Sequence, residues 1–396
     1  MSAPHDLLNP RLYDKVRLPP LEAETLPPWC YTSKEWFDLE VERLFRKSWN
    51  FIGHEGRIPN PGDYFTMDFT GIPIIVVRGR DGVVRCFANS CRHRGAMVLQ
   101  GEGNCKAGIK CPYHGWIYGA DGRLTGAVGM EAANNFNKDE NGLIPVRLEM
   151  WAHFMFIHFE KDAAPLSEWL GDLPARVAPY EPEKLALTRR QVYDLKCNWK
   201  LYVENFKDLS HTKTVHKDTL YQMELNYTGP LERTDGANYH AAFTPHEGSR
   251  AIIGGVGGGV QGFPPIKGFT NGTIRSGSFY PTIFPLTCFG FCIDSAWFLE
   301  MYPSAPDRMQ LVVGSMFYED TLKRPDFEEI AQLYYKRMDI AVPEDNDANE
   351  NTQAGLRSPH SVPGRMGEPE LSLNTAHNYW LDKVIGPSAQ RRPRAA

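Results

Sequence analysis

Two short segments of the chain each place a cysteine and a histidine beside a glycine, and they limit the possible folds more than any other feature. Cys91 and His93 are two residues apart, and Cys111 and His114 are three apart. Cysteine and histidine are ligands of zinc and of iron–sulfur clusters, and paired spacings of this kind bring two ligands to one point from a tight loop. The sequence therefore predicts a fold that holds two loops together around a metal group.

The order of the ligands favours an iron–sulfur cluster over zinc. Each loop supplies one cysteine and then one histidine, whereas zinc sites tend to pair cysteines and histidines separately. Gly95 and Gly115 follow the ligands and permit a close approach of the backbone to a cluster. Cys86 and Cys105 lie outside the two motifs, and we expect them to be ordinary buried residues.

The composition excludes several classes of protein. The 396 residues carry a formal net charge of −5, and a sequence pI of about 6.2 lacks the basic footprint of a nucleic-acid-binding protein. The first fifteen residues have no apolar segment typical of a signal peptide. The uncharged run 276–293 contains two prolines, so we expect two buried strands there rather than a membrane helix. These features predict a cytoplasmic protein with reduced cysteines and no membrane or nucleic-acid partner.

The pattern along the chain predicts an α+β protein. Ser33 is a candidate N-cap of an amphipathic helix. Short β-rich runs follow, with Asp-Gly hairpin turns in "RGRDG" and "GADGR". We expect an N-terminal segment over residues 1–46, a β-rich metal-binding domain over 47–160, and a domain over 161–396 that contains an antiparallel sheet.

A second group of metal-binding side chains lies near the middle of the chain. Asp208 and His211 are three residues apart and are expected to share one helix face. His216 joins them only if that helix ends or bends. Two histidines and one carboxylate bind Fe(II) and leave open positions for O₂ and substrate. Because a cluster only carries electrons, such a site would be their acceptor.

The carboxylate has four candidates in one acidic segment. These are Glu344, Asp345, Asp347 and Glu350. Pro343 precedes them and predicts a break between two helices, since proline removes a backbone donor. Acidic residues that open a helix are often only partners of its dipole. Spacing alone leaves the choice open.

The two loops resemble the Rieske family along their whole length. The resemblance is carried by "CRHRGAMV" and "CPYHGWIY". It implies that residues 47–160 form a Rieske domain with a [2Fe–2S] cluster, in which Cys91 and Cys111 hold one iron and His93 and His114 hold the other. Neutral histidine in place of thiolate raises the reduction potential.

The second half of the chain resembles the catalytic domain of Rieske oxygenase α subunits, the terminal components of ring-hydroxylating oxygenases. The resemblance is carried by the tripeptide Asn198–Lys200 and by the acidic residue and two histidines after it. It implies a helix-grip-like catalytic domain over 161–396, into which the Rieske domain is inserted. His211 and His216 are implied as ligands of a mononuclear Fe(II). The family's third ligand is often the second member of an acidic doublet, which selects Asp345 and leaves Asp347 as the alternative.

The resemblance also implies a role for Asp208. The matching residue of the family accepts the free ring N–H of the first iron-binding histidine, here His211, and bridges to the second Rieske histidine, here His114, of a neighbouring subunit. Asp208 would then couple the two metal centres without binding iron.

The family further implies the activity and the partners. Electrons from NAD(P)H would come through a separate reductase, a ferredoxin or both, and O₂ would be used to hydroxylate a small organic substrate. The chain would assemble as a head-to-tail trimer, with or without a β subunit. The apolar and aromatic run 278–298 suits an aromatic substrate. The acidic segment after Pro343 also resembles branches that oxidise quaternary amines, so N- or O-dealkylation of such a compound or of an anilide is the alternative. The rival hypothesis is an electron-transfer or zinc-binding structural protein without catalysis. It would give no role to His211, His216 and Asp345.

Overall fold

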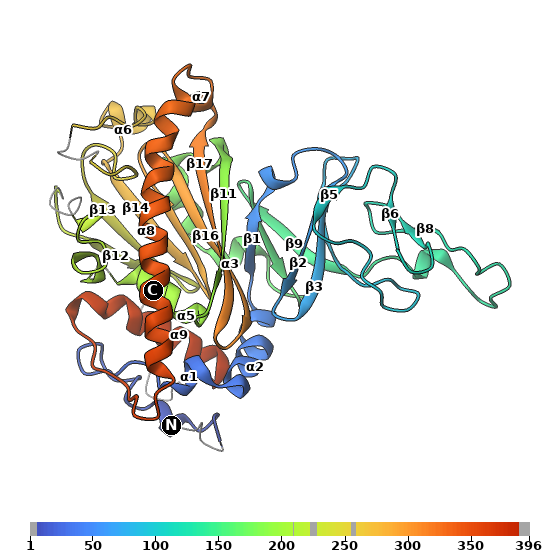
Figure 1. The fold of residues 1–396 in the computed structure, drawn as a ribbon, viewed down its shortest axis with the longest axis horizontal. Helices are drawn as coiled ribbons and strands as arrows, with labels where there is room; N and C mark the ends of the chain where they lie inside the picture. Colours follow the sequence, from blue (N-terminus) through green and yellow to red (C-terminus); the bar gives the residue numbers. More distant parts are fainter. Residues whose placement is uncertain (1–5, 209, 222–227, 255–258, 388–396) are drawn as a thin grey trace. The chain divides into compact units, whose positions relative to one another are not determined.

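The computed structural model describes residues 6–208, 210–221, 228–254 and 259–387. The chain divides into two compact units, one formed by Met1–Ser48 with Ser167–Ala396 and the other by Trp49–Leu166. Each unit is built on an antiparallel sheet (Figure 1), so the predicted α+β class is confirmed. None of the described helices has the length and apolar character needed to cross a bilayer.

The unit Trp49–Leu166 contains a seven-stranded and a three-stranded antiparallel sheet. The larger sheet has the order β1-β10-β9-β4-β3-β2-β5, and the smaller has the order β6-β7-β8. The two Asp-Gly sequences turn the hairpins β3–β4 and β7–β8 as predicted. The strands are β1 (Asn50–His54), β2 (Asp63–Phe69), β3 (Ile72–Arg78), β4 (Val84–Ala88), β5 (Glu102–Asn104), β6 (Ile109–Lys110), β7 (Ile117–Tyr118), β8 (Leu124–Gly126), β9 (Pro145–Trp151) and β10 (Phe154–His158).

The other unit contains a second seven-stranded antiparallel sheet, in the order β11-β17-β16-β15-β14-β13-β12. The uncharged run 276–293 forms β14 and β15, so its prediction as two buried strands is confirmed. The strands are β11 (Leu185–Leu195), β12 (Glu232–Asp235), β13 (Tyr239–Pro245), β14 (Gly277–Ile283), β15 (Thr287–Phe291), β16 (Ala296–Ala305) and β17 (Arg308–Tyr318).

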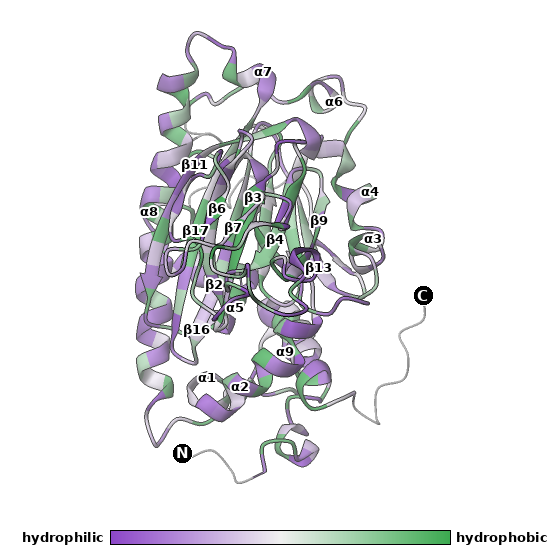
Figure 2. Ribbon diagram, turned by 90° about the vertical axis from the view of Figure 1, so that its right-hand side faces the viewer, coloured by the Kyte–Doolittle hydropathy of each residue, from purple (hydrophilic) through white to green (hydrophobic). Residues whose placement is uncertain are grey.

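Helices surround this second sheet, and the longest, α8 (Phe327–Leu356), runs along it (Figure 1). Figure 2 shows hydrophobic and hydrophilic bands alternating along α8, as expected for a helix with one buried face. Phe327, Ala331 and Tyr334 of α8 pack against Phe317 of β17. The other α-helices are α1 (Trp29–Thr32), α2 (Lys34–Arg43), α3 (Leu166–Leu170), α4 (Leu173–Val177), α5 (Trp199–Lys207), α6 (Lys267–Thr270), α7 (Glu319–Leu322) and α9 (Leu371–Val384).

Helix α2 begins where the sequence predicts. The hydroxyl oxygen of Ser33 accepts a hydrogen bond from the backbone N–H of Trp36 at 3.2 Å. This side chain satisfies one of the donors that a helix N-terminus leaves without a partner. The predicted N-cap is therefore confirmed.

The tripeptide Asn198–Lys200 anchors α5 to α2 through a buried ion pair. Asn198 caps α5 by accepting from the backbone N–H of Lys200 at 3.0 Å. The Lys200 ammonium donates to Glu40 of α2 at 2.6 Å, and the Trp199 indole donates to the same carboxylate at 3.0 Å. Glu40 and Lys200 are both fully buried, and removing one partner would leave the other as an uncompensated buried charge. The tripeptide thus fixes the start of the helix that leads to the candidate iron site.

The predicted break at Pro343 is wrong, because α8 continues through it as one helix of 30 residues. An interior proline costs about 3 kcal/mol in an isolated helix. Ala341 and Val342 before the proline and Asn346 after it are all buried, so packing on both sides offsets that cost. The continuous helix determines which acidic side chains face the cavity described below.

The prediction that Asp208 and His211 share a helix face is also wrong. Helix α5 ends at Lys207, and Asp208 is its C-cap in an extended conformation. His211 lies in a separate 3₁₀ turn, η7 (Ser210–Lys213). The Asp208 carboxylate accepts from the backbone N–H of Ser210 at 2.7 Å and from its hydroxyl at 2.6 Å. Such a local turn competes with helix continuation.

Candidate metal centres

The two Cys/His loops share one backbone arrangement. In the first, the Cys91 N–H donates to the Ala96 carbonyl at 2.8 Å, and the Gly95 N–H donates to the Cys91 carbonyl at 2.8 Å. In the second, the Cys111 N–H donates to the Trp116 carbonyl at 2.8 Å, and the Gly115 N–H donates to the Cys111 carbonyl at 3.1 Å. Gly95 and Gly115 have φ of 77° and 72°, a left-handed conformation that favours glycine. Glycine is therefore needed for the turn as well as for close approach.

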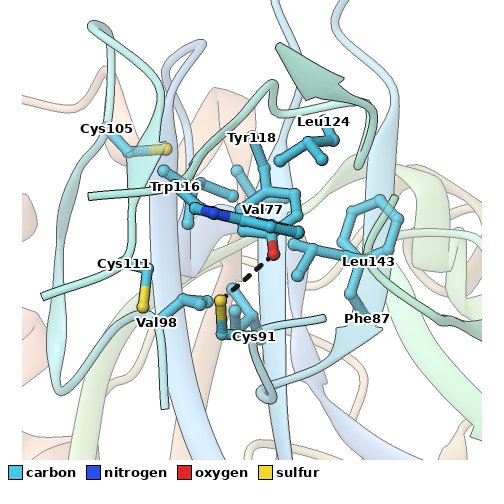
Figure 3. Packing of buried hydrophobic residues seen from close by; sticks show 12 residues of the cluster. Val77, Phe87, Cys91, Val98, Cys105, Cys111, Trp116, Tyr118, Leu124 and Leu143 are labelled. Carbon is cyan, nitrogen blue, oxygen red and sulfur yellow. Dashed lines mark hydrogen bonds between the residues drawn. The ribbon is translucent and has the colours of Figure 1, made fainter. Parts of the chain in front are cut away.

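The four side chains of these loops gather at one place. The rings of His93 and His114 lie 4.5 Å apart, edge to face, and His93 stacks on Trp116 at 4.9 Å. Cys91 and Cys111 are buried and form no disulfide. Figure 3 shows both sulfur atoms beside the packed core, with Cys91 Sγ 3.2 Å from the Tyr118 hydroxyl.

These residues fit a metal group larger than a single ion. The Nδ1 atom of His93 is buried without a hydrogen-bond partner, and a buried ring nitrogen of this kind calls for a ligand. A tetrahedral zinc site would bring all its donor atoms within about 4 Å of one another, given bond lengths near 2.0–2.3 Å. The four loop side chains do not form so compact a set among the described residues. A two-iron cluster takes its ligands at two separate irons, so it does not need all four donor atoms to lie that close together.

The second centre is formed by His211, His216 and Asp345. One ligand atom from each lies within 4.8 Å of the others, and no second group of three or more potential ligands is this compact in the described part of the chain. Asp345 Oδ1 is 3.0 Å from His216 Nε2 and 3.5 Å from His211 Nε2. The two histidines come from η7 and the turn after it, and Asp345 comes from α8. This is the side-chain set of a two-histidine, one-carboxylate iron site.

The four candidate carboxylates have four different surroundings. Asp345 meets both histidines, whereas Glu344 accepts from the other ring nitrogen of His216 at 2.6 Å. Asp347 is exposed, and Glu350 accepts from the backbone N–H of Lys196 at 2.8 Å. The structure thus brings Asp345 to the histidines and Glu344 behind one of them. The assignment of ligand roles stays a prediction.

Two further residues of the site were missed by the sequence analysis. The Asn205 side chain donates to Asp345 Oδ1 at 3.0 Å. Thr219 donates to the Glu344 carboxylate at 3.0 Å and holds it against His216. The only signal for Asn205 in the sequence was its position three residues before Asp208. For Thr219, no signal was present.

Asp208 lies behind the other histidine but is less tightly held to it. Its Oδ2 is 3.8 Å from His211 Nδ1, which is beyond hydrogen-bonding distance, and that nitrogen is buried without an acceptor. The interaction is therefore electrostatic in this structure.

The charges of the second centre stabilise one another. Burial by itself would raise the pKa of Asp345, but His211 and His216 hold that pKa below its usual value. Burial would lower the pKa of His211, but Asp208 and Asp345 raise it to about 9. Without a metal, the centre is thus an ion cluster with at least one protonated imidazole, and a metal ion would replace that proton.

A cavity of about 170 Å³ adjoins the second centre, and His211, His216 and Asp345 form part of its wall. Phe206, Tyr280 and Trp297 form an aromatic part of the wall, in which Trp297 lies 5.7 Å from Phe206 and 6.3 Å from Tyr280. Most of the other aromatic rings of the run 278–298 are buried in the core of the sheet instead. The cavity can hold a small organic molecule beside the three candidate ligands.

Both halves of the chain match protein-family models. Residues 48–137 match the Rieske [2Fe-2S] domain, and residues 182–386 match the catalytic domain of the ring hydroxylating alpha subunit. The second match alone covers about half of the chain. The models thus identify two domains in the order that the sequence motifs predicted.

Two curated relatives illustrate the similarity. The chain is 40% identical over 199 residues to the carnitine monooxygenase oxygenase subunit of Escherichia coli (strain K12), a match that covers 50% of this chain and 53% of that subunit. It is 32% identical over 382 residues to the chloroplastic choline monooxygenase of Beta vulgaris, covering 93% of this chain and 78% of that protein. The chain thus spans about half the length of the first relative and most of the second.

Solved structures share the fold. The quaternary ammonium Rieske monooxygenase CntA in complex with L-carnitine superposes with a TM-score of 0.76 and 24% identity, covering 94% of this chain and 98% of that chain. Naphthalene 1,2-dioxygenase from Rhodococcus sp. bound to indole has a TM-score of 0.76 and 21% identity, covering 96% and 100%. At these identities the likeness shows the fold alone.

Proposed function

The chain belongs to the family of Rieske-type ring-hydroxylating oxygenase alpha subunits, a family of oxidoreductases, and from that premise we propose that it is the oxygenase component of a monooxygenase that oxidises a quaternary ammonium compound. The observation that carries the proposal is the meeting of His211, His216 and Asp345 at the wall of an aromatic-lined cavity. The names of the relatives, carnitine monooxygenase and choline monooxygenase, support the substrate class.

The first centre would hold a [2Fe–2S] cluster. Cys91 and Cys111 would bind one iron, and His93 and His114 would bind the other. The cluster would supply electrons one at a time, at a potential raised by its neutral ligands. Trp116 stacks on His93 and fixes the plane of that ring. Tyr118 places its hydroxyl against the Cys91 sulfur, where a hydrogen bond stabilises thiolate charge.

The second centre would hold a mononuclear Fe(II), which supplies the chemistry of oxygen activation when it is bound. The protein's part is to orient the three ligands. Glu344 accepts the Nδ1 proton of His216, which leaves Nε2 free to bind a metal. Asn205 donates to Asp345 and limits the rotation of that carboxylate.

The cavity would position the substrate and exclude water. The faces of Phe206, Tyr280 and Trp297 can hold an ammonium group by cation–π attraction. Hydroxylation of a ring, the expectation from the sequence, stays a second candidate because the same aromatic wall also suits a ring.

Further partners belong to the proposal. Electrons would come from NAD(P)H through a reductase, a ferredoxin or both, and the chain would work as a trimer, with or without a β subunit. Asp208 would couple His211 to the cluster of a neighbouring subunit. Location in the cytoplasm stays a prediction.

Metal analysis and a turnover assay test the proposal together. The purified protein should contain three iron atoms per chain and acid-labile sulfide. With a surrogate reductase and ferredoxin, it should convert a quaternary amine to a product of changed mass more readily than an aromatic hydrocarbon. Zinc in place of iron, or cluster iron alone, would support the rival protein without catalysis.

A further inference from the structure

One face of α8 connects the candidate iron site to an arginine. Arg337, Ala341 and Asp345 follow one another at four-residue intervals, and all three line the same cavity. Residues four apart lie on one helix face. With a rise of about 1.5 Å per residue, Arg337 and Asp345 are separated by about 12 Å along the helix. The cavity therefore has a metal-binding end and an arginine end.

Arg337 has no carboxylate partner among the described residues. Its Nε is buried without an acceptor, and its terminal NH1 reaches only the sulfur of Met338 at 3.5 Å. The guanidinium lies 5.7 Å from the centre of the Trp297 ring. Arginine presents donors in a fixed fork that matches a carboxylate, so an unpaired guanidinium on a cavity wall is suited to an anionic ligand.

Trp297 adds a second buried donor at the same place. Its indole Nε1 is also buried without an acceptor, and the side chain is 9% exposed. Buried donors are normally paired, because an unmet donor keeps its full desolvation cost. Two unmet N–H groups on neighbouring side chains of one wall call for a shared acceptor.

The charge around this end of the cavity is positive. Arg250 and Arg233 also line the cavity, whereas the carboxylates that the described residues contribute to its wall are Asp208 and Asp345. Asp345 is engaged by the histidines. Burial raises the pKa of Tyr280 to about 12, and the positive charges of Arg250 and Arg337 oppose that rise. Both guanidinium groups therefore act on the region around Tyr280, where they favour a ligand that carries a negative charge as well as a positive one.

We propose that Arg337 and the indole N–H of Trp297 bind a carboxylate of the substrate. This inference rests on the proposed function and deepens it, because it makes the substrate a zwitterion with its ammonium group near His216 and Asp345. The backbone positions of Arg337 and Asp345 are about 12 Å apart along α8, so the substrate and the two side chains together span that separation. A quaternary ammonium alcohol would leave both donors unmet.

An acid and its methyl ester test the inference. The probes are 4-(trimethylammonio)butanoate and its methyl ester, which carry the same cation, and the dissociation constants are measured by calorimetry on the iron-loaded protein. A hydrogen bond to a charged group is worth about tenfold to a hundredfold in binding, so the wild-type protein should prefer the acid by that factor. Arg337→Gln should abolish the preference while the affinity for the ester changes less than twofold.

Further variants separate a local effect from misfolding. Lys336→Gln, at the exposed neighbouring position on α8, should keep the full preference. Arg337→Lys, which retains charge without the fork, should keep part of it, and Trp297→Phe should reduce it. Equal affinity of the wild-type protein for acid and ester, or an equal loss for both in Arg337→Gln, would overturn the inference.

The design distinguishes this inference from the proposed function. If neither ammonium probe binds but benzoate or methyl benzoate does, the proposed substrate class is wrong. The ratio of the dissociation constants of benzoate and methyl benzoate, measured for the wild-type protein and for Arg337→Gln, then tests whether Arg337 binds a carboxylate. A preference for benzoate that Arg337→Gln abolishes would support the site, and its absence would overturn it.

Discussion

The candidate cluster loops take all four ligands from 24 consecutive residues, Cys91 to His114, whereas the candidate iron site combines His211 and His216 with Asp345 from a distant helix. In the loops, each ligand pair is held by the same two backbone hydrogen bonds and one left-handed glycine. At the iron site, the ligands are held by side chains, among them Asn205 and Glu344. The geometry of the first site is therefore determined by adjacent residues in the chain, whereas the geometry of the second depends on how α8 packs.

Removal of one ligand from each site should give the largest and most selective effects. Asp345→Ala should lose the mononuclear iron and all product formation but keep the cluster's visible absorption, because the two sites share no ligand. Cys111→Ser should lose the cluster spectrum. Iron content and spectra would be measured on both variants. Asp347→Ala, at an exposed position, is the matched control, and loss of iron in that variant would reverse the choice of carboxylate.

Asp208→Asn should separate electron transfer from metal binding. The variant keeps the shape of the side chain but removes the charge that lies 3.8 Å from His211. Product formation should fall by about a hundredfold, the upper range for loss of a residue that orients a ligand, with both metals still bound. Single-turnover transfer from the reduced cluster to the iron would locate the defect. Normal transfer kinetics in this variant would show that Asp208 does not couple the two metal centres.

Glu344→Gln should weaken the iron site by a smaller factor. The amide can no longer accept the Nδ1 proton of His216 as a charged group, although that contact is 2.6 Å in the structure. Iron affinity should fall about tenfold, as measured by competition with a chelator, and the cluster should be unaffected. An unchanged affinity would show that Asn205 and the backbone suffice to orient the ligands.

Iron uptake by the metal-free second site should depend on pH. The pKa of His211 is raised to about 9, so its imidazole is protonated at pH 7 and must lose that proton to bind a metal. The apparent affinity should therefore rise with pH, by up to about tenfold per pH unit between pH 7 and 9, and then level off. Titration of apoprotein that retains its cluster would measure this. A flat profile would contradict the charge state described here.

The smallest effect should come from the glycine turns of the cluster loops. Gly115 has φ of 72°, and an added Cβ would meet only the Lys110 side chain at 3.6 Å. Gly115→Ala should therefore destabilise the loop by backbone strain alone, about 1–2 kcal/mol, seen as faster bleaching of the cluster on heating. Gly355→Ala within α8 is the control, because its Cβ would meet nothing within 4 Å and alanine favours a helix. Equal bleaching rates would show that the turn is not strained.

Local chemistry explains which predictions from the sequence succeeded. Ser33 caps α2, the Asp-Gly turns close two hairpins, and the run 276–293 forms two strands. Each depends on residues adjacent in the chain, whose hydrogen bonds and allowed φ values are properties of the segment itself.

Tertiary packing explains one of the predictions that failed, and a local side-chain turn explains the other. Pro343 does not end α8, because Val342 and Asn346 are buried on either side of it. Asp208 and His211 do not share a helix, because the Asp208 side chain forms its own turn with Ser210. At Pro343, packing outweighs the preference of the residue itself, and at Asp208 a side-chain turn outweighs the helical spacing.

The sequence by itself determined that this chain carries two Cys/His loops and a pair of histidines with an acidic partner. The family resemblance selects Asp345, but spacing alone leaves the choice of acid open, because Glu344 and Asp345 are adjacent and point about 100° apart around a helix of 3.6 residues per turn. That choice depends on the rotation of α8, which is fixed by the packing of Phe327, Ala331 and Tyr334. The same rotation places Arg337 on the cavity wall. Arg337 and Ala341 lie eight and four residues before Asp345, and residues at these intervals share one face of a helix.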